Sequence, residues 1–171
     1  MIIFYNYVMK SIEGHFIDAS IFLAAILEPR TRTDKKQQRL ALRYFTRLSS
    51  GVFSGYVTLT VYSEVVHIIM SEIDEIVWVQ AINQFLNLMS NSSIKLETPS
   101  RIKTYRVCMT IKSLESRIGP TDTTLLAEAI TLNIPYFITF DERLGKYVRN
   151  NKTGKKLITI KRLSDAFFAK D

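Results

Sequence analysis

Apolar and polar residues alternate along the chain in blocks that suit strands and helices in turn. A short apolar run over residues 15–17 predicts a strand that ends at Asp18, and the apolar residues 21–27 predict a helix that Pro29 helps to end. Between residues 35 and 48, apolar side chains fall at positions 40, 41, 44, 45 and 48, which lie on one face of a helix. The first third of the chain therefore predicts one strand followed by two helices.

The remaining blocks repeat this alternation. Strands are expected at residues 56–60, 94–96, 136–140 and 156–160, and helices at residues 61–70, 75–89, 101–114, 122–133 and around Asp165. Parallel strands need crossover connections, and helices between strands supply them. The pattern predicts the α/β class, with helices on both faces of a central, mostly parallel sheet.

Composition limits the architecture to one domain. The 171 residues are 47% hydrophobic, with only six Gly and four Pro, so we expect a single domain over residues 15–171 and an N-terminal extension or edge strand over residues 1–14. Cys108 is the only cysteine, which excludes a disulfide framework and a Cys-rich zinc site and favours the cytoplasm. The apolar start is too short for a membrane span, so no membrane association is expected.

The net charge of +7 is unevenly distributed. Residues 30–47 and residues 145–171 each carry +6, so the rest of the chain sums to −5. Lys35, Arg39, Arg43 and Arg47 recur every four residues on the polar face of the second helix; we call them the basic stripe. The stripe suits contacts with RNA, but a solvated helix face would show the same pattern, and the sequence leaves both interpretations open.

Three aspartates stand at predicted strand ends or helix starts. Asp18 and Asp141 each follow a strand, and ligands of parallel sheets gather at the carboxyl ends of the strands. Asp122 begins a helix and shares a face with Leu125 and Ala129. Taken singly, each aspartate is also explained as a helix N-cap.

Glu64 is harder to explain as a structural residue. It interrupts an apolar stripe that includes Val61 and Ile68, and a carboxylate that faces a core is costly unless it is paired or bound to a metal. The alternative is that Glu64 lies at the rim of its helix and is solvated. Four convergent acids would repel one another without a divalent cation, and oxygen ligands favour Mg²⁺ or Mn²⁺ over zinc.

Other chemistries lack their residues. His15 and His67 are isolated, and neither an HExxH motif nor a cysteine cluster supplies zinc ligands. The chain has no GxSxG elbow, no P-loop and no GxGxxG segment, and Ser20 stands where a haloacid dehalogenase phosphatase needs a second Asp.

Four segments in order carry a family resemblance: HFIDASIFLAAIL, VTLTVYSEVVHII, GPTDTTLLAEAITLNIPYFITFDERL and KLITIKRLSDAF. Together they resemble the PIN domain of VapC-like toxins and related archaeal proteins, which implies a three-layer α/β/α fold. By this resemblance the family's acidic positions fall on the acidic set, our name for Asp18, Glu64, Asp122 and Asp141. Its polar supporting positions fall on Ser20 and Thr139.

The resemblance implies a metal-dependent endoribonuclease that uses Mg²⁺ or Mn²⁺ and acts on single-stranded or looped RNA. It also implies homodimerisation and pairing with a small antitoxin protein. The alternative is a non-catalytic nucleic-acid-binding or interaction module that keeps the fold. Retention of all four acids favours the enzyme.

Overall fold

The computed structural model describes residues 12–150 and 157–168. The strands are β1 (Glu13–Ile17), β2 (Phe53–Thr58), β3 (Lys95–Glu97), β4 (Tyr136–Thr139) and β5 (Thr159–Arg162). The helices are α1 (Ala19–Ile26), α2 (Arg32–Ser49), α3 (Leu59–Glu72), α4 (Glu75–Asn91), α5 (Arg101–Leu114), α6 (Pro120–Thr131), α7 (Glu142–Asn150) and the 3-10 helix η1 (Asp165–Phe168).

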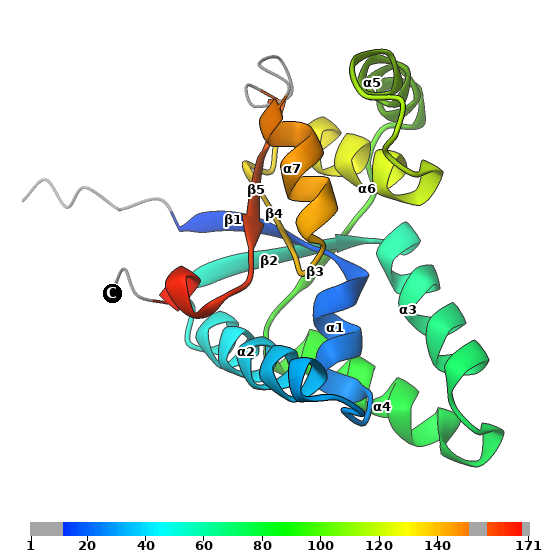
Figure 1. Cartoon of the computed structure of the whole chain (residues 1–171), viewed down its shortest axis with the longest axis vertical. Helices are drawn as coiled ribbons and strands as arrows, with labels where there is room; N and C mark the ends of the chain where they lie inside the picture. Colours follow the sequence, from blue (N-terminus) through cyan, green and yellow to red (C-terminus); the bar gives the residue numbers. More distant parts are fainter. Residues whose placement is uncertain (1–11, 151–156, 169–171) are drawn as a thin grey trace, which may run out of the picture.

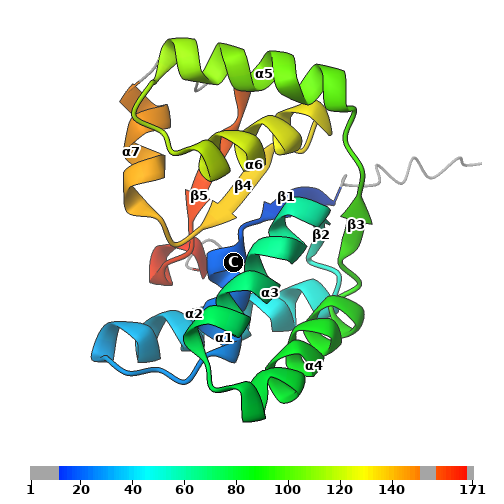
Figure 2. The same cartoon turned by 90° about the vertical axis from the view of Figure 1, so that its right-hand side faces the viewer.

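The five strands form one sheet in the order β3-β2-β1-β4-β5, and every pairing is parallel. Both views place α5, α6 and α7 on one side of the sheet and α1, α2 and α4 on the other (Figures 1 and 2). The predicted α/β class with helices on both faces is confirmed. The strand order reverses at β1, which lies between β2 and β4, so the carboxyl ends of these three strands border the crevice where such folds bind ligands.

The central strands are buried on both faces. Phe16, Ile17, Phe137 and Ile138 are completely buried, as expected for strands that helices cover on both sides. Helix α2 begins with a capping box, because Thr31 and Asp34 each accept a backbone N–H from the other. The apolar face of α2 packs into the same core, which agrees with the predicted periodicity.

Several boundaries differ from the sequence-based expectations. β2 ends at Thr58, so Leu59 and Thr60 begin α3 instead of ending the strand. α6 begins at Pro120, two residues earlier than predicted, because the fixed φ of proline suits the first helical position. β5 covers Thr159–Arg162, and the first expected residue of that strand, at position 156, lies outside the described residues.

Most of the expected N-terminal extension, residues 1–11, also lies outside the described residues. β1 starts at Glu13, and its position between β2 and β4 makes it a central strand of the sheet. Within the described ranges, none of the helices has the length and apolar character that crossing a bilayer requires.

Candidate active site

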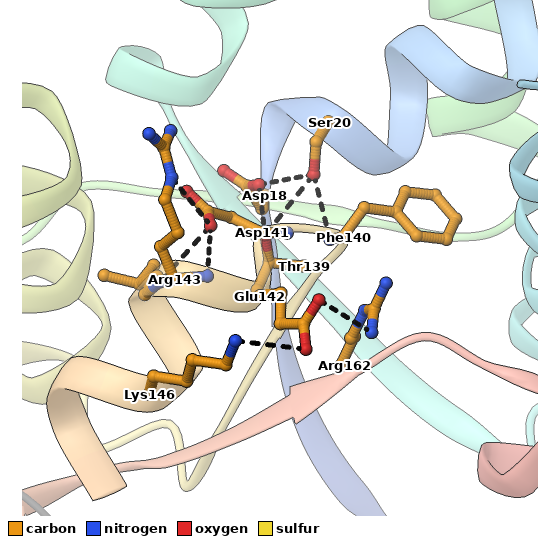
Figure 3. Close-up of polar contacts among 10 residues, drawn as sticks. Asp18, Ser20, Thr139, Phe140, Asp141, Glu142, Arg143, Lys146 and Arg162 are labelled. Carbon is orange, nitrogen blue, oxygen red and sulfur yellow. Dashed lines mark hydrogen bonds and ion pairs between the residues drawn. The ribbon is translucent and has the colours of Figure 1, made fainter. Parts of the chain in front are cut away.

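Asp18 follows β1 and is held by two hydroxyl groups at the carboxyl end of the sheet. Its Oδ2 accepts hydrogen bonds from Ser20 Oγ at 2.5 Å and from Thr139 Oγ1 at 2.7 Å. The backbone N–H of Phe140 donates to Ser20 Oγ at 3.2 Å, and that of Asp141 donates to Thr139 Oγ1 at 2.9 Å (Figure 3). The start of α1 and the end of β4 are thereby joined around one carboxylate.

Asp18 occupies the N-cap position of α1, but its side chain makes no capping hydrogen bond to that helix. Burial raises the pKa of Asp18, although the hydrogen bonds from Ser20 and Thr139 act in the opposite direction. The carboxylate is therefore held mainly by the hydroxyl groups of Ser20 and Thr139 at the carboxyl end of the sheet.

Asp141 does cap a helix. Its Oδ1 accepts the backbone N–H groups of Arg143 at 2.7 Å and Leu144 at 3.2 Å, at the start of α7. The Nε of Arg143 lies 3.9 Å from the same oxygen, and the Arg143 side chain is exposed (Figure 3). The capping interpretation thus holds for Asp141, and the cap fixes the side chain beside Asp18 and Thr139.

Asp122 is the third residue of α6 and is half-buried. Gly119 occupies the N-cap position, so the capping interpretation of Asp122 is wrong. Burial raises the pKa of Asp122, and the negative charges of Asp18 and Asp141 raise it further, against the opposing effect of Arg143. Asp122 is therefore electrostatically linked to both aspartates at the strand ends.

Glu64 projects from α3, whose neighbouring residues Val61 and Val65 are completely buried. Its Oε2 is buried and has no hydrogen-bond partner among the residues that the structure describes. Burial raises the pKa of Glu64 to about 7, and the charges of Asp18 and Asp122 contribute to this increase. A buried carboxylate oxygen without a donor is unfavourable, so the site lacks a positive group at this point.

The acidic set is linked by charge but does not form a ready-made ligand cage. In residues 12–150 and 157–168, no three His, Cys, Asp or Glu side chains lie close enough together to hold an ion as they stand. The donors are carboxylate oxygens, and one of them is buried without a partner, which fits a hard divalent cation such as Mg²⁺ or Mn²⁺. Asp18, Glu64, Asp122 and Asp141 are the residues that could hold it.

Glu128 is a buried acid that the sequence analysis did not identify. It lies on α6 with 8% of its surface exposed, and it accepts hydrogen bonds from Thr58 at 2.6 Å and Thr60 at 2.7 Å. The available signal was an acidic residue inside the apolar run LLAEAI, which also suits an ordinary exposed helix position. The threonine partners are 70 and 68 residues away in sequence, so local pattern could not reveal them.

The basic stripe is largely engaged by the C-terminal turn. The guanidinium groups of Arg43 and Arg47 lie over the ring of Phe168, at 4.3 Å and 5.0 Å from its centroid. Arg39 lies 3.9 Å from Asp165, and Lys36, outside the stripe, pairs with Asp165 at 2.7 Å. Three of the four stripe residues thus contact η1, and an RNA-binding role for the stripe stays a prediction.

Comparison with solved structures shows the same fold in three bacterial VapBC complexes. A chain of VapBC2 from Rickettsia felis bound to a promoter DNA fragment matches with a TM-score of 0.64 and 14% identity, covering 88% of this chain and 99% of that one. A chain of DNA-bound VapBC from Salmonella typhimurium matches with a TM-score of 0.60 and 13% identity, covering 90% of this chain and 100% of that one. A chain of VapBC-1 from nontypeable Haemophilus influenzae matches with a TM-score of 0.57 and 13% identity, covering 88% of this chain and 98% of that one.

At such low identity these likenesses concern the fold alone. The search of curated protein sequences returned no match. The family model of the PIN domain matches residues 15–150, a range that contains the complete acidic set together with Ser20 and Thr139. The match covers most of the chain, and the chain therefore belongs to the PIN domain family.

Proposed function

We propose that this protein is a metal-dependent endoribonuclease whose site is the acidic set. The observation that carries the proposal is Glu64. Its buried Oε2 has no hydrogen-bond donor within the described part of the chain, and its pKa is raised to about 7 by burial and by neighbouring acids. A divalent cation would supply the missing positive charge and lower the repulsion among all four acids.

In this proposal each residue has a separate task. Asp18, Glu64, Asp122 and Asp141 hold Mg²⁺ or Mn²⁺, which when bound supplies a water of lowered pKa and neutralises charge on the phosphate. Ser20 and Thr139 keep Asp18 in one orientation, because both donate to its Oδ2. Hydrolysis through water leaves 5′-phosphate and 3′-hydroxyl ends, and no protein nucleophile is required.

The substrate proposed is single-stranded or looped RNA. Phosphates would be attracted by the two basic segments, residues 30–47 and 145–161, which flank the otherwise acidic chain. Arg143 places one exposed guanidinium beside Asp141, at the edge of the acidic set. Binding should therefore weaken as salt concentration rises.

The test compares RNA cleavage by the wild type and by an Asp18→Asn/Asp141→Asn variant, with Mn²⁺, with Mg²⁺ and with chelator. Cleavage that needs the metal and disappears in the variant supports the enzyme. If wild type and variant both bind RNA and neither cleaves it under any condition, the protein is a non-catalytic binding module. Direct ligation of the products, which requires 3′-hydroxyl and 5′-phosphate ends, identifies the bond that is broken.

We also propose that the chain is the toxin of a toxin–antitoxin pair and forms a homodimer. The support is the fold that it shares with chains of VapBC complexes, together with a groove of about 870 Å³ between α1, the start of α2 and the α3–α4 turn. The groove is lined by apolar residues such as Leu23 and Val77 and also by polar residues such as Glu28, Gln37 and Glu72, which suits an amphipathic segment of a small protein partner. Co-purification with the product of a neighbouring short gene, and the mass of the purified chain in solution, test the two statements.

A further inference from the structure

Burying the carboxylate of Glu128 costs free energy, and nothing in its own helix requires a carboxylate at this position. Its neighbours Leu126, Ala127 and Ala129 are almost completely buried, so an apolar residue would fit the position. Each carboxylate oxygen instead accepts one hydroxyl, Oε2 from Thr58 and Oε1 from Thr60. Charge-assisted hydrogen bonds of this length offset part of the desolvation cost, and both donors come from another part of the chain.

The two threonines form the corner between β2 and α3. Thr58 stands at the N-cap position of α3, yet its hydroxyl does not cap the helix and donates to Glu128 instead. Thr58 is almost completely buried, whereas Leu59 between the two threonines is 66% exposed. The polar side chains of this corner therefore point toward α6, and the apolar one points toward solvent.

These hydrogen bonds join two helices that otherwise have different partners. α3 packs mainly on α1, α4 and β2, whereas α6 packs on α5 and β4. Figures 1 and 2 show α6 grouped with α5 and α7, with α3 apart from them. The bonds of Glu128 thus connect the two groups beside the carboxyl end of β2.

Each connected helix carries one member of the acidic set. Thr60 and Glu64 are four residues apart on α3, so they lie on the same face of that helix. Asp122 lies on α6, and the charges of Glu64 and Asp122 interact across the space between the helices. A shift of α3 relative to α6 would therefore change the separation of Glu64 from Asp122.

We propose that Glu128 is a positioning residue that sets the spacing between Glu64 and Asp122 by tying α3 to α6 through Thr58 and Thr60. Its use in metal binding rests on the proposed function. Partners that hydrogen-bond a metal ligand commonly change metal affinity by about 10- to 100-fold when they are replaced, and Glu128, which acts through the two helices, is expected at the lower end of this range. Replacement of Glu128 should therefore weaken Mn²⁺ binding without removing any of the four acids.

The first measurement is Mn²⁺ affinity without RNA, by calorimetry or electron paramagnetic resonance. We expect about tenfold weaker binding for Glu128→Leu, a smaller loss for Glu128→Gln, and a loss for Thr60→Val that is not additive with Glu128→Leu. Thr131→Val is the matched control, because Thr131 is on the same helix and contacts Thr104 of α5 instead of α3. This control should bind Mn²⁺ like the wild type.

The second measurement needs no metal. Spin labels at His67→Cys on α3 and Lys103→Cys on α5, in a Cys108→Ser background, report the spacing of the two helix groups, since both positions are exposed. Glu128→Leu and Thr60→Val should broaden or shift the distance distribution, and Thr131→Val should not. An unchanged distribution in folded Glu128→Leu and Thr60→Val proteins overturns the proposal, whatever their thermal stability.

The two measurements separate this proposal from the proposed function. If the wild type shows no Mn²⁺ binding that depends on the acidic set, the proposed function fails, and the distance measurement alone decides the role of Glu128. If spacing changes while Mn²⁺ affinity stays within twofold of the wild type, the link to metal binding is wrong.

Discussion

The acidic set and the contact between α2 and η1 are two charged regions that differ in how their charges are matched. At the carboxyl end of the sheet, Glu64 Oε2 has no donor among residues 12–150 and 157–168, and burial raises the pKa of Asp18 and of Asp122. At the other contact, Lys36 of α2 pairs with Asp165 of η1, and hydrogen bonding to Lys36 lowers the pKa of that carboxyl. One region leaves charge uncompensated and the other pairs it within the chain.

In the proposed function, this difference separates binding residues from structural ones. Burying like charges together lowers stability, so an unmatched buried carboxylate is a candidate for binding a ligand. Ion pairs and ring contacts that are complete within the chain stabilise the fold without any ligand.

Replacing Glu64 should remove activity and raise stability. Glu64→Gln keeps the shape but removes the charge, so we expect RNA cleavage to fall by at least about 100-fold and the melting temperature of the metal-free protein to rise. Cleavage rates with Mn²⁺ and thermal unfolding in chelator measure the two effects. Glu115→Gln is the control, because Glu115 is paired with Arg117, and loss of that pair should not raise stability. A variant that is less stable and fully active would mean that Glu64 is structural.

His15 of β1 and Glu64 of α3 should give opposite responses of stability to pH. Burial lowers the pKa of His15 to about 4, so the unfolded state binds its proton first and stability falls as pH drops from about 6.5 toward 4. Between pH 7.5 and pH 5 this amounts to about 2 kcal/mol for a fully buried histidine. The pKa of Glu64 is raised to about 7, so its contribution is present below about 4.5 and is lost as pH rises through 7.

Urea unfolding across pH 4.5–8 measures both slopes. His15→Phe should flatten the acid side, because it removes the titrating ring from among Phe53 and Tyr44. It should also lower stability at every pH, because the buried Tyr44 hydroxyl loses its hydrogen bond with His15 Nδ1. Glu64→Gln should flatten the neutral side in chelator, and addition of Mn²⁺ to the wild type should do the same. Identical slopes in wild type and both variants would show that neither group titrates as its surroundings require.

The alternation of apolar blocks was enough to predict the sheet and most helices, because buried strands and amphipathic helices leave a direct periodic signal. It also placed Asp18 and Asp141 at strand ends. It could not show that Asp141 caps its helix whereas Asp18 does not. That difference arises because Ser20 and Thr139, which are far apart in sequence, both donate hydrogen bonds to Asp18. Glu128 and the contact of Arg43 with Phe168 depend on partners far away in sequence.

Truncation of Arg43 should lower stability. Its guanidinium lies 4.3 Å from the ring centroid of Phe168, which is 4% exposed, so Arg43→Ala removes a ring contact and the packing of the side-chain stem. We expect a loss of about 1 kcal/mol in the free energy of unfolding, measured in urea. Lys35→Ala is the matched control on the same helix and should change stability by less than about 0.5 kcal/mol. Equal effects of the two variants would contradict a structural role for the inner part of the basic stripe.

For RNA binding, Lys35→Ala should have the larger effect and Arg43→Ala the smaller one. Both changes should be smaller than the loss of stability in Arg43→Ala. Lys35 is exposed and has no ion-pair partner among residues 12–150 and 157–168, so it is the stripe residue best able to meet a phosphate. Lys35→Ala should weaken RNA binding about twofold and reduce the slope of log affinity against log salt by about 0.7, the value for one phosphate contact on a single strand. Arg43→Ala, whose charge already lies over Phe168, should leave the slope unchanged while it lowers stability. If Arg43→Ala changes the slope and Lys35→Ala does not, η1 leaves α2 when RNA binds, and the basic stripe is a binding surface that the C-terminal turn covers in the free protein.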